Sequence, residues 1–199
     1  MKSLLTMAAM LLAVSAAEAQ ISLGQPAYGG TGCPAGSASV SLTEDQQTLS
    51  ILFDSFVVQA PTIQGANFDR KNCNLRIPVR VGSGYQVALI AFDYNGFAAI
   101  PQGGRGNFEA RYSYVGQVRP AIFRKTFMGG QANNYSLKNE LISTTVDWTP
   151  CSTGKDLMMV VDANILAMTN RNQDAAQLSI DSVDVSTGLL YKYQIRRCR

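Results

Sequence analysis

Residues 74–81 read Asn-Leu-Arg-Ile-Pro-Val-Arg-Val, and apolar and polar side chains alternate along this stretch. The four aliphatic residues share one face of an extended chain, and Arg76 and Arg80 lie on the other face. A period of two is typical of a β-strand with one face buried. Pro78 has no backbone N–H, so it predicts that this strand lies at a sheet edge or contains a bulge.

Similar stretches recur along the rest of the chain. They cover residues 39–42, 49–53, 56–58, 85–94, 108–115, 121–128, 142–148, 157–168, 177–185 and 189–197. Residues 157–168 fit a buried strand or a helix, and their β-branched side chains favour the strand. About ten short strands separated by turns are typical of two packed sheets. We therefore predict an all-β fold, an antiparallel β-sandwich of jelly-roll type.

Turn residues predict how some of these strands connect. Asn95-Gly96 is the strongest signal, because both central residues of a type I′ hairpin need positive φ, which Asn and Gly tolerate. We therefore predict a hairpin with this dipeptide at its tip. The polar residues 129–139 are predicted as a loop. Thr187-Gly188 is predicted as the turn of a closing strand pair near the end of the chain.

The first residues predict export. Lys2 precedes a short apolar run at residues 4–14, and Ala17-Glu18-Ala19 forms a small-x-small cleavage site. The run is too short for a bilayer, which needs about 20 apolar residues. We predict that residues 1–19 are a signal peptide and that residues 20–199 form a single secreted or periplasmic domain. No transmembrane segment is expected.

Four cysteines follow the predicted cleavage site, namely Cys33, Cys73, Cys151 and Cys198. An even number in an exported chain implies two disulfides, and three pairings are possible. We prefer Cys33–Cys73 and Cys151–Cys198, because each would tie one half of the chain. The chain has no histidine and no CxxC pair, so neither a metal site nor a cofactor is expected.

The net charge of +3 is unevenly distributed. Residues 20–69 contain four acidic and no basic side chains, residues 70–138 contain ten basic and two acidic ones, and residues 139–199 contain six and seven. The basic middle could form a patch for anionic polymers. Scatter over the strand faces is favoured, because clustering along a sequence does not ensure clustering in space. Export and the lack of a nucleic-acid motif argue against a nucleic-acid partner.

Seven short motifs are spread over nearly all of the predicted mature chain and include every cysteine. They are Gly30-Thr31-Gly32-Cys33-Pro34, Phe53-Asp54-Ser55-Phe56, Asp69-Arg70-Lys71-Asn72-Cys73, Gly84-Tyr85, Asp93-Tyr94-Asn95-Gly96, Trp148-Thr149-Pro150-Cys151 and Arg196-Arg197-Cys198. Together they resemble an uncharacterised family of secreted domains of unknown function from fungi and bacteria. The resemblance implies a small exported β-rich domain with four half-cystines and assigns no catalytic residue. Asn95 departs from the family pattern, which has arginine before this glycine.

Few enzymatic mechanisms are open to this sequence. The absence of histidine excludes Ser-His-Asp and Cys-His arrangements, and oxidised cysteines would supply no thiolate. Asp54 and Asp93 interrupt apolar segments, where an unpaired carboxylate would be costly. They could form structural ion pairs, for Asp54 with Arg70 or Lys71, or they could cleave a glycosidic bond. The ion-pair interpretation is favoured, and no catalytic residue is assigned.

The predicted function is a non-enzymatic binding or structural module of the cell envelope or extracellular space. Its expected partner is an anionic or neutral glycan or another envelope component. The candidate binding residues are Asp54, Arg70, Lys71, Asp93, Arg105 and Arg111. The alternative is a carboxylate-dependent polysaccharide hydrolase or lyase, which requires two acidic side chains in one cleft.

Aromatic residues supply one further pair of predictions. Four tyrosines alternate along predicted strands and are expected in the core or on a sheet face rather than on a sugar-binding platform. They are Tyr112, Tyr114, Tyr191 and Tyr193. Trp148 is predicted to pack against a disulfide, because it lies close to Cys151 in the sequence.

Overall fold

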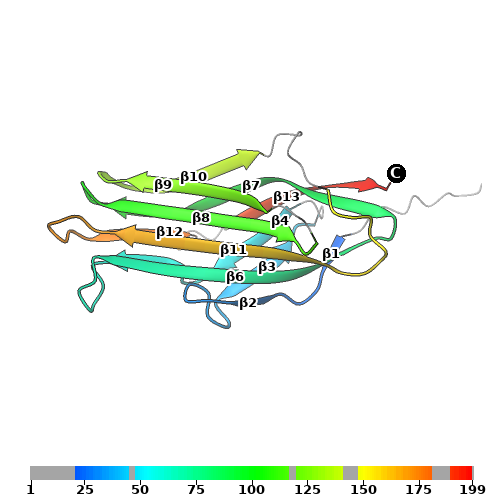
Figure 1. The fold of residues 1–199 in the computed structure, drawn as a ribbon, viewed down its shortest axis with the longest axis horizontal. Coiled ribbons are helices and arrows are strands. Elements are labelled where there is room, and N and C mark those ends of the chain that lie inside the picture. The colour runs from blue at the N-terminus through cyan, green and yellow to red at the C-terminus, as the bar shows by residue number, and fades with distance from the viewer. Residues whose placement is uncertain (1–20, 45–47, 117–119, 141–147, 181–188, 199) are drawn as a thin grey trace, which may run out of the picture.

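A computed structural model describes residues 21–44, 48–116, 120–140, 148–180 and 189–198 of the 199-residue chain. Within these ranges the chain forms thirteen strands and no helix. The strands form two packed antiparallel sheets, so the predicted all-β sandwich is confirmed (Figure 1). The predicted signal peptide and nearly all of the predicted strand at 142–148 lie outside the described residues.

Sheet A forms the front layer in Figure 1, where β6, β11, β8 and β9 run side by side. The strand order is β1-β6-β11-β8-β9, and β2 pairs with β6 beside β1. The bounds of its strands are β1 Ile21–Leu23, β2 Ala27–Gly29, β6 Phe68–Val81, β8 Arg105–Tyr114, β9 Ala121–Met128 and β11 Leu157–Met168. The strands predicted at 74–81, 121–128 and 157–168 are therefore confirmed.

Sheet B forms the second layer around one long strand, β7. Along one edge β7 pairs with β10, and along the other it pairs first with β13 and then with β12. β4 and β3 extend the sheet from β13, and β5 extends it from β12. The bounds are β3 Ala38–Leu42, β4 Thr48–Phe53, β5 Val57–Ala60, β7 Tyr85–Ile100, β10 Gln131–Glu140, β12 Ala176–Ile180 and β13 Leu189–Arg197.

Side chains from the facing sides of the two sheets form the core. Tyr94 of β7 meets Phe108 of β8 at a centroid distance of 4.8 Å and Phe123 of β9 at 4.9 Å, so aromatic rings link sheet B to sheet A. Tyr112, Tyr114 and Tyr193 are also buried, as predicted. Alternation along β6 and β8 places most of their apolar residues inside and most of their polar residues outside.

The hairpin predicted at Asn95-Gly96 is wrong, because both residues lie inside β7. Gly96 is instead required by a close approach of other strands. A Cβ there would lie 2.1 Å from the carbonyl oxygen of Ser179 in β12 and 2.6 Å from the hydroxyl of Tyr135 in β10. The Tyr135 hydroxyl donates a hydrogen bond of 2.6 Å to that same carbonyl. The glycine therefore serves packing rather than a turn.

Two other predicted connections differ from the structure. Residues 131–140 form strand β10 rather than a loop. β10 borders the sheet and leaves much of its polar sequence exposed, as is common for edge strands. β12 and β13 do not pair with each other within the described residues, because each pairs with a different part of β7. The predicted turn at 187–188 lies outside those residues.

Pro78 lies in an inner strand, contrary to the prediction of an edge or a bulge. β6 pairs with β11 on one side and with β1 and β2 on the other. The carbonyl of Pro78 accepts a hydrogen bond of 2.8 Å from the Gly24 N–H, so the missing N–H of Pro78 faces the same side. β1 ends at Leu23 and β2 begins at Ala27, and the proline falls at this interruption.

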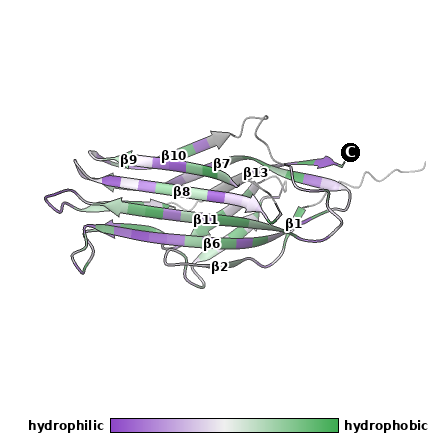
Figure 2. Ribbon diagram, viewed as in Figure 1, coloured by the Kyte–Doolittle hydropathy of each residue, from purple (hydrophilic) through white to green (hydrophobic). Residues whose placement is uncertain are grey.

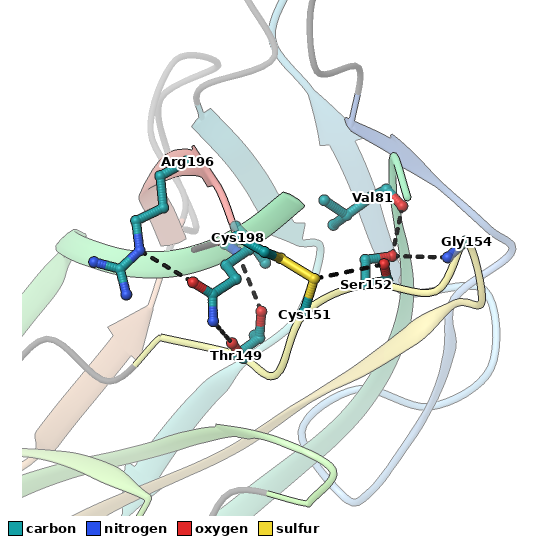
Figure 3. Close-up of a disulfide and its surroundings, with 9 residues drawn as sticks. Val81, Thr149, Cys151, Ser152, Gly154, Arg196 and Cys198 are labelled. Carbon is teal, nitrogen blue, oxygen red and sulfur yellow. Dashed lines mark hydrogen bonds between the residues drawn. A yellow bond between two sulfur atoms is a disulfide. The ribbon is translucent and has the colours of Figure 1, made fainter. Parts of the chain in front are cut away.

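Both preferred disulfides are present, Cys33–Cys73 and Cys151–Cys198. The second joins the segment before β11 to the end of β13 (Figure 3). Ser152 anchors this segment. Its hydroxyl donates a hydrogen bond of 2.8 Å to the carbonyl of Val81 and accepts one of 3.1 Å from the Gly154 N–H. Trp148 lies under the Arg196 guanidinium, 3.9 Å from the ring centroid.

Candidate functional site

The outer face of sheet A carries a group of arginines that we call the arginine face. It consists of Arg70 and Arg76 on β6, Arg105 and Arg111 on β8, and Arg124 on β9. Each is exposed and occupies an outward position in the alternation of its strand, so each points away from the core. Arg80 lies on the same face and is held by Asp156 at 2.8 Å. Six of the ten basic residues between 70 and 138 therefore lie on one face, where the register distributes them along the length of β6.

Strand register arranges this face in cross-strand rows. One row runs Arg70, Leu166, Asn107 and Thr126 across β6, β11, β8 and β9. The next row runs Asn72, Asn164, Glu109 and Arg124. Adjacent strands lie about 4.8 Å apart and adjacent rows on one face about 6.8 Å apart. Amide and guanidinium groups therefore repeat at intervals across a sheet surface.

Glu109 holds two of the arginines in place. Its carboxylate accepts a hydrogen bond of 2.6 Å from Arg124 Nε on one oxygen and a hydrogen bond of 2.7 Å from Arg111 Nε on the other. The hydrogen bond from Arg124 is the main reason that the pKa of Glu109 lies below its usual value, and Arg111 lowers it further. Both guanidinium side chains remain exposed, by 49% for Arg111 and 62% for Arg124. The trio keeps a net charge of +1.

A hollow of about 380 Å³ lies in the middle of this face. Its polar lining includes Arg70, Asn107, Glu109, Arg124 and Asn164. Such groups donate and accept hydrogen bonds in fixed directions, and guanidinium pairs with carboxylate. Figure 2 shows the hydrophilic residues of β6 gathered toward the beginning of the strand. Arg70, which lines the hollow, belongs to this part of β6.

An apolar row borders the hollow at one end of the sheet. Phe68, Met168, Arg105 and Met128 follow one another across β6, β11, β8 and β9. The three apolar side chains are 52%, 42% and 62% exposed, respectively. We call these three residues the apolar row. Large apolar side chains gathered on one surface are typical of an interaction site.

A second hollow, of about 490 Å³, lies where β5, β6 and β12 meet. Asp54, Asp69 and Lys71 are among its lining residues. The Asp69 carboxylate accepts a hydrogen bond of 3.1 Å from the Gln59 N–H. Within the described residues Asp54 makes no ion pair within 4.0 Å, so its predicted pairing with Arg70 or Lys71 is wrong. Asp54 is exposed in the bend after β4 and carries no burial cost that a partner would have to offset.

The six candidate residues from the sequence therefore separate into three places. Arg70, Arg105 and Arg111 share the arginine face, and Asp54 and Lys71 line the second hollow. Asp93 lies on β7 in the other sheet, opposite Lys138 of β10. Across the described ranges, no three His, Cys, Asp or Glu side chains gather as a metal site would require.

Comparison with known families finds one family model that covers nearly the whole chain. A family model described as "Domain of unknown function (DUF4360)" matches residues 19–198, which include all four cysteines. The chain belongs to this family. The resemblance inferred from the short motifs is thereby confirmed, and the DUF4360 match covers both sheets.

Two further similarities accompany the DUF4360 match. A protein from Arthroderma benhamiae, described as "Uncharacterized secreted protein", is 32% identical over 171 residues, which are 86% of this chain and 69% of the relative. The solved structure of TmCBM61 in complex with β-1,4-galactotriose matches with a TM-score of 0.33 and 9% identity, covering 87% of this chain and 88% of that one. At that similarity it supports no inference about ligands. No helix in the described parts of this DUF4360 chain could span a bilayer.

Sequence reasoning missed several residues of the arginine face. Arg124 and Asn164 occupy outward positions of predicted strands, and Asn107 directly precedes the strand predicted at 108–115, but none of the three was a candidate. Alternation could have assigned each of them to a strand's polar side. It could not place them together, because β8 and β11 pair across about fifty residues of sequence.

Proposed function

We propose that this chain is a secreted binding module, without catalytic activity of its own, that holds an anionic polysaccharide on the arginine face. One observation carries the proposal: strand register brings five arginines from three strands onto one exposed face, and two of them, Arg70 and Arg124, line a hollow in it. Such a surface attracts polyanions at long range. Amide groups of Asn107 and Asn164 in the hollow suit the hydroxyl groups of sugars.

We also propose that the chain is exported. Residues 1–19 act as the signal peptide, and residues 20–199 form one domain in the oxidising space outside the cytosol. Two disulfides and the secreted relative support this placement. Mass spectrometry of the exported protein should find Gln20 at its N-terminus.

A carboxylate-dependent hydrolase finds less support from the predicted pair. Ser50, Leu190 and Asp93 are in register across β4, β13 and β7, and Asp54 follows Ser50 by four residues. Two strand spacings across the sheet and four residues along a strand therefore separate the Cα atoms of Asp54 and Asp93, a distance of about 16 Å. Glycosidases hold their two carboxyl groups about 5 to 9.5 Å apart. Asp54 and Asp93 do not meet this requirement.

The proposal is tested by removing charge from the arginine face. The double variant Arg70→Gln/Arg105→Gln should lower affinity for polygalacturonate at low salt by about tenfold or more, because two exposed cations are lost from the binding surface. Affinity electrophoresis or calorimetry would measure it. Binding should also weaken as salt is raised, since screening shortens the range of these charges.

A matched control separates local from global charge. Lys138→Gln/Lys192→Gln removes two positive charges from exposed positions of sheet B. It should bind polygalacturonate as the unaltered protein does. Equal losses for the two double variants, or no binding by the unaltered protein to any anionic polysaccharide, would refute the proposal.

A further inference from the structure

The apolar row lies at an end of the sandwich where hydrogen bonds tie neighbouring turns together. The β5–β6 loop, the β7–β8 and β9–β10 turns and the β11–β12 loop gather at this end, on the left in Figure 1. The Gly130 N–H donates a hydrogen bond of 2.8 Å to the carbonyl of Ile100, and this bond ties the β9–β10 turn to β7. Asn170 Nδ2 donates a hydrogen bond of 2.9 Å to the carbonyl of Gln102, and this bond ties the β11–β12 loop to the β7–β8 turn. These bonds fix the strand ends that present the row.

The row and the hollow form one continuous surface. Arg105 lies within the row, between Met168 and Met128, and Arg70 lies in the next row toward the hollow. Leu166 lies in the same row as Arg70 and lines the hollow. The four strands span about 14 Å, and the two rows are separated by about 6.8 Å. Apolar contact area and positive charge thus run side by side across the sheet.

The chemistry of this pairing selects one class of ligand. A uronic acid unit has a ring face of C–H groups and a carboxylate at its edge. The ring face gains by covering apolar side chains, and the carboxylate gains by meeting a guanidinium. Phe68 offers a flat ring for the first contact, and Arg70 and Arg105 offer the second.

We propose that a uronic acid polymer lies across β6, β11, β8 and β9, with sugar rings on the apolar row and carboxylates toward Arg70 and Arg105. This inference rests on the proposed function and deepens it. It assigns contact with the sugar rings to Phe68, Met168 and Met128. A polyanion that lacks sugar rings would use the arginines alone.

The test compares two probes of similar charge density, polygalacturonate and polyglutamate. Phe68→Ser and Met168→Ser should each weaken polygalacturonate binding by about tenfold, because the lost apolar burial is comparable to one side chain. Both variants should bind polyglutamate within about twofold of the unaltered protein. Val115→Ser is the control, since Val115 is 66% exposed but follows the opposite end of β8. It should bind both probes normally.

Each other outcome has a definite meaning. If the unaltered protein binds both probes and neither row variant changes polygalacturonate binding, the stacking role is overturned and the proposed function stands. If neither probe binds, both proposals fall. If the protein binds vesicles containing anionic lipid, binds no polygalacturonate and loses vesicle binding in Phe68→Ser, the surface serves a lipid interface and the uronic acid assignment is overturned. Phe68 and Met168 are both substantially exposed, and matched melting temperatures would verify folding.

Discussion

Glu109 limits the positive charge of the arginine face, as does Asp162 of β11, which lies on the same face in register with Arg111. The Glu109 carboxylate bridges Arg111 and Arg124 across β8 and β9. Because the two guanidinium groups lower its pKa, it stays ionised below the pH at which a free glutamate is protonated, about 4.3. Its stabilising contribution is therefore present above that pH and is lost as the pH falls through the lowered value.

Glu109→Gln should strengthen binding to polygalacturonate by about fivefold, because removing one charge at this position is worth on the order of 1 kcal/mol. The variant should lose only about 0.5–1 kcal/mol of stability, since the trio is largely solvent-exposed. Calorimetric titration measures the first effect and urea denaturation the second.

Asp93→Asn is the matched control for Glu109→Gln. It raises the net charge by the same amount but acts on β7 in sheet B. Its affinity for polygalacturonate should equal that of the unaltered protein. Stronger binding in both variants would show that overall charge, rather than the arginine face, governs the interaction.

Close packing of neighbouring strands requires glycine at position 96. Gly96→Ala should cost about 2–3 kcal/mol, because the new Cβ would meet the Ser179 carbonyl at 2.1 Å and force strands apart. Gly29→Ala in β2 should stay within about 0.5 kcal/mol, since no atom lies within 4 Å of its Cβ position. Urea unfolding compares the two. Equal stability of both variants would contradict the assigned role of Gly96.

At the scale of elements, β6 separates two chemical environments through simple alternation. Phe68 and Arg70 face outward onto the proposed binding surface, and Asp69 and Lys71 line the second hollow. Further along, Cys73 faces the core, where it joins Cys33. One strand therefore contributes to the ligand surface, a polar hollow and a buried disulfide.

The two disulfides should differ in their response to mild reductant. Cys33 and Cys73 are fully buried, whereas Cys151 is exposed and Cys198 partly so. Thiol–disulfide exchange requires access to sulfur. Dithiothreitol without denaturant should therefore reduce Cys151–Cys198 first, as seen by alkylation and mass spectrometry. Each bridge contributes about 4 kcal/mol in the chain-entropy model, so the singly reduced protein should melt at a lower temperature. Simultaneous reduction of both bridges would contradict this order.

At the scale of the whole molecule, the aromatic core links stability to alkaline pH. Burial raises the pKa of Tyr112 and Tyr114 well above the usual value for tyrosine. The unfolded chain therefore loses these protons at about pH 10 while the folded chain keeps them. Since the folded state then binds more protons, stability falls as the pH rises.

The melting temperature should accordingly decrease steadily above about pH 10, and Tyr114→Phe should show a shallower decrease after its own lower stability is taken into account. Calorimetry across a series of alkaline buffers would measure this. Tyrosinate absorbance should develop fully only with unfolding. Ordinary titration of every tyrosine in a protein that remains folded would contradict the prediction.

Local patterns in the sequence predicted the strand character and the buried Tyr112, Tyr114 and Tyr193, whereas the cysteines allowed three disulfide pairings, of which the preferred one is present. Alternation along residues 74–81 and the β-branched side chains of residues 157–168 depend only on near neighbours, so a single chain reveals them. The same reasoning failed for Gly96 and for β10. A glycine required by a close approach resembles a turn glycine in sequence, and a polar edge strand resembles a loop.

Tertiary structure alone decided where the arginines meet. Arg70, Arg105 and Arg124 lie far apart in the sequence, and only the pairing of β6, β11, β8 and β9 brings them onto one face. In sheet B, the register of β4, β13 and β7 separates Asp54 from Asp93, which the sequence offered as one pair. Register between distant strands depends on burying one whole face of each strand at once. That energy belongs to the assembled core, and no short stretch of sequence contains it.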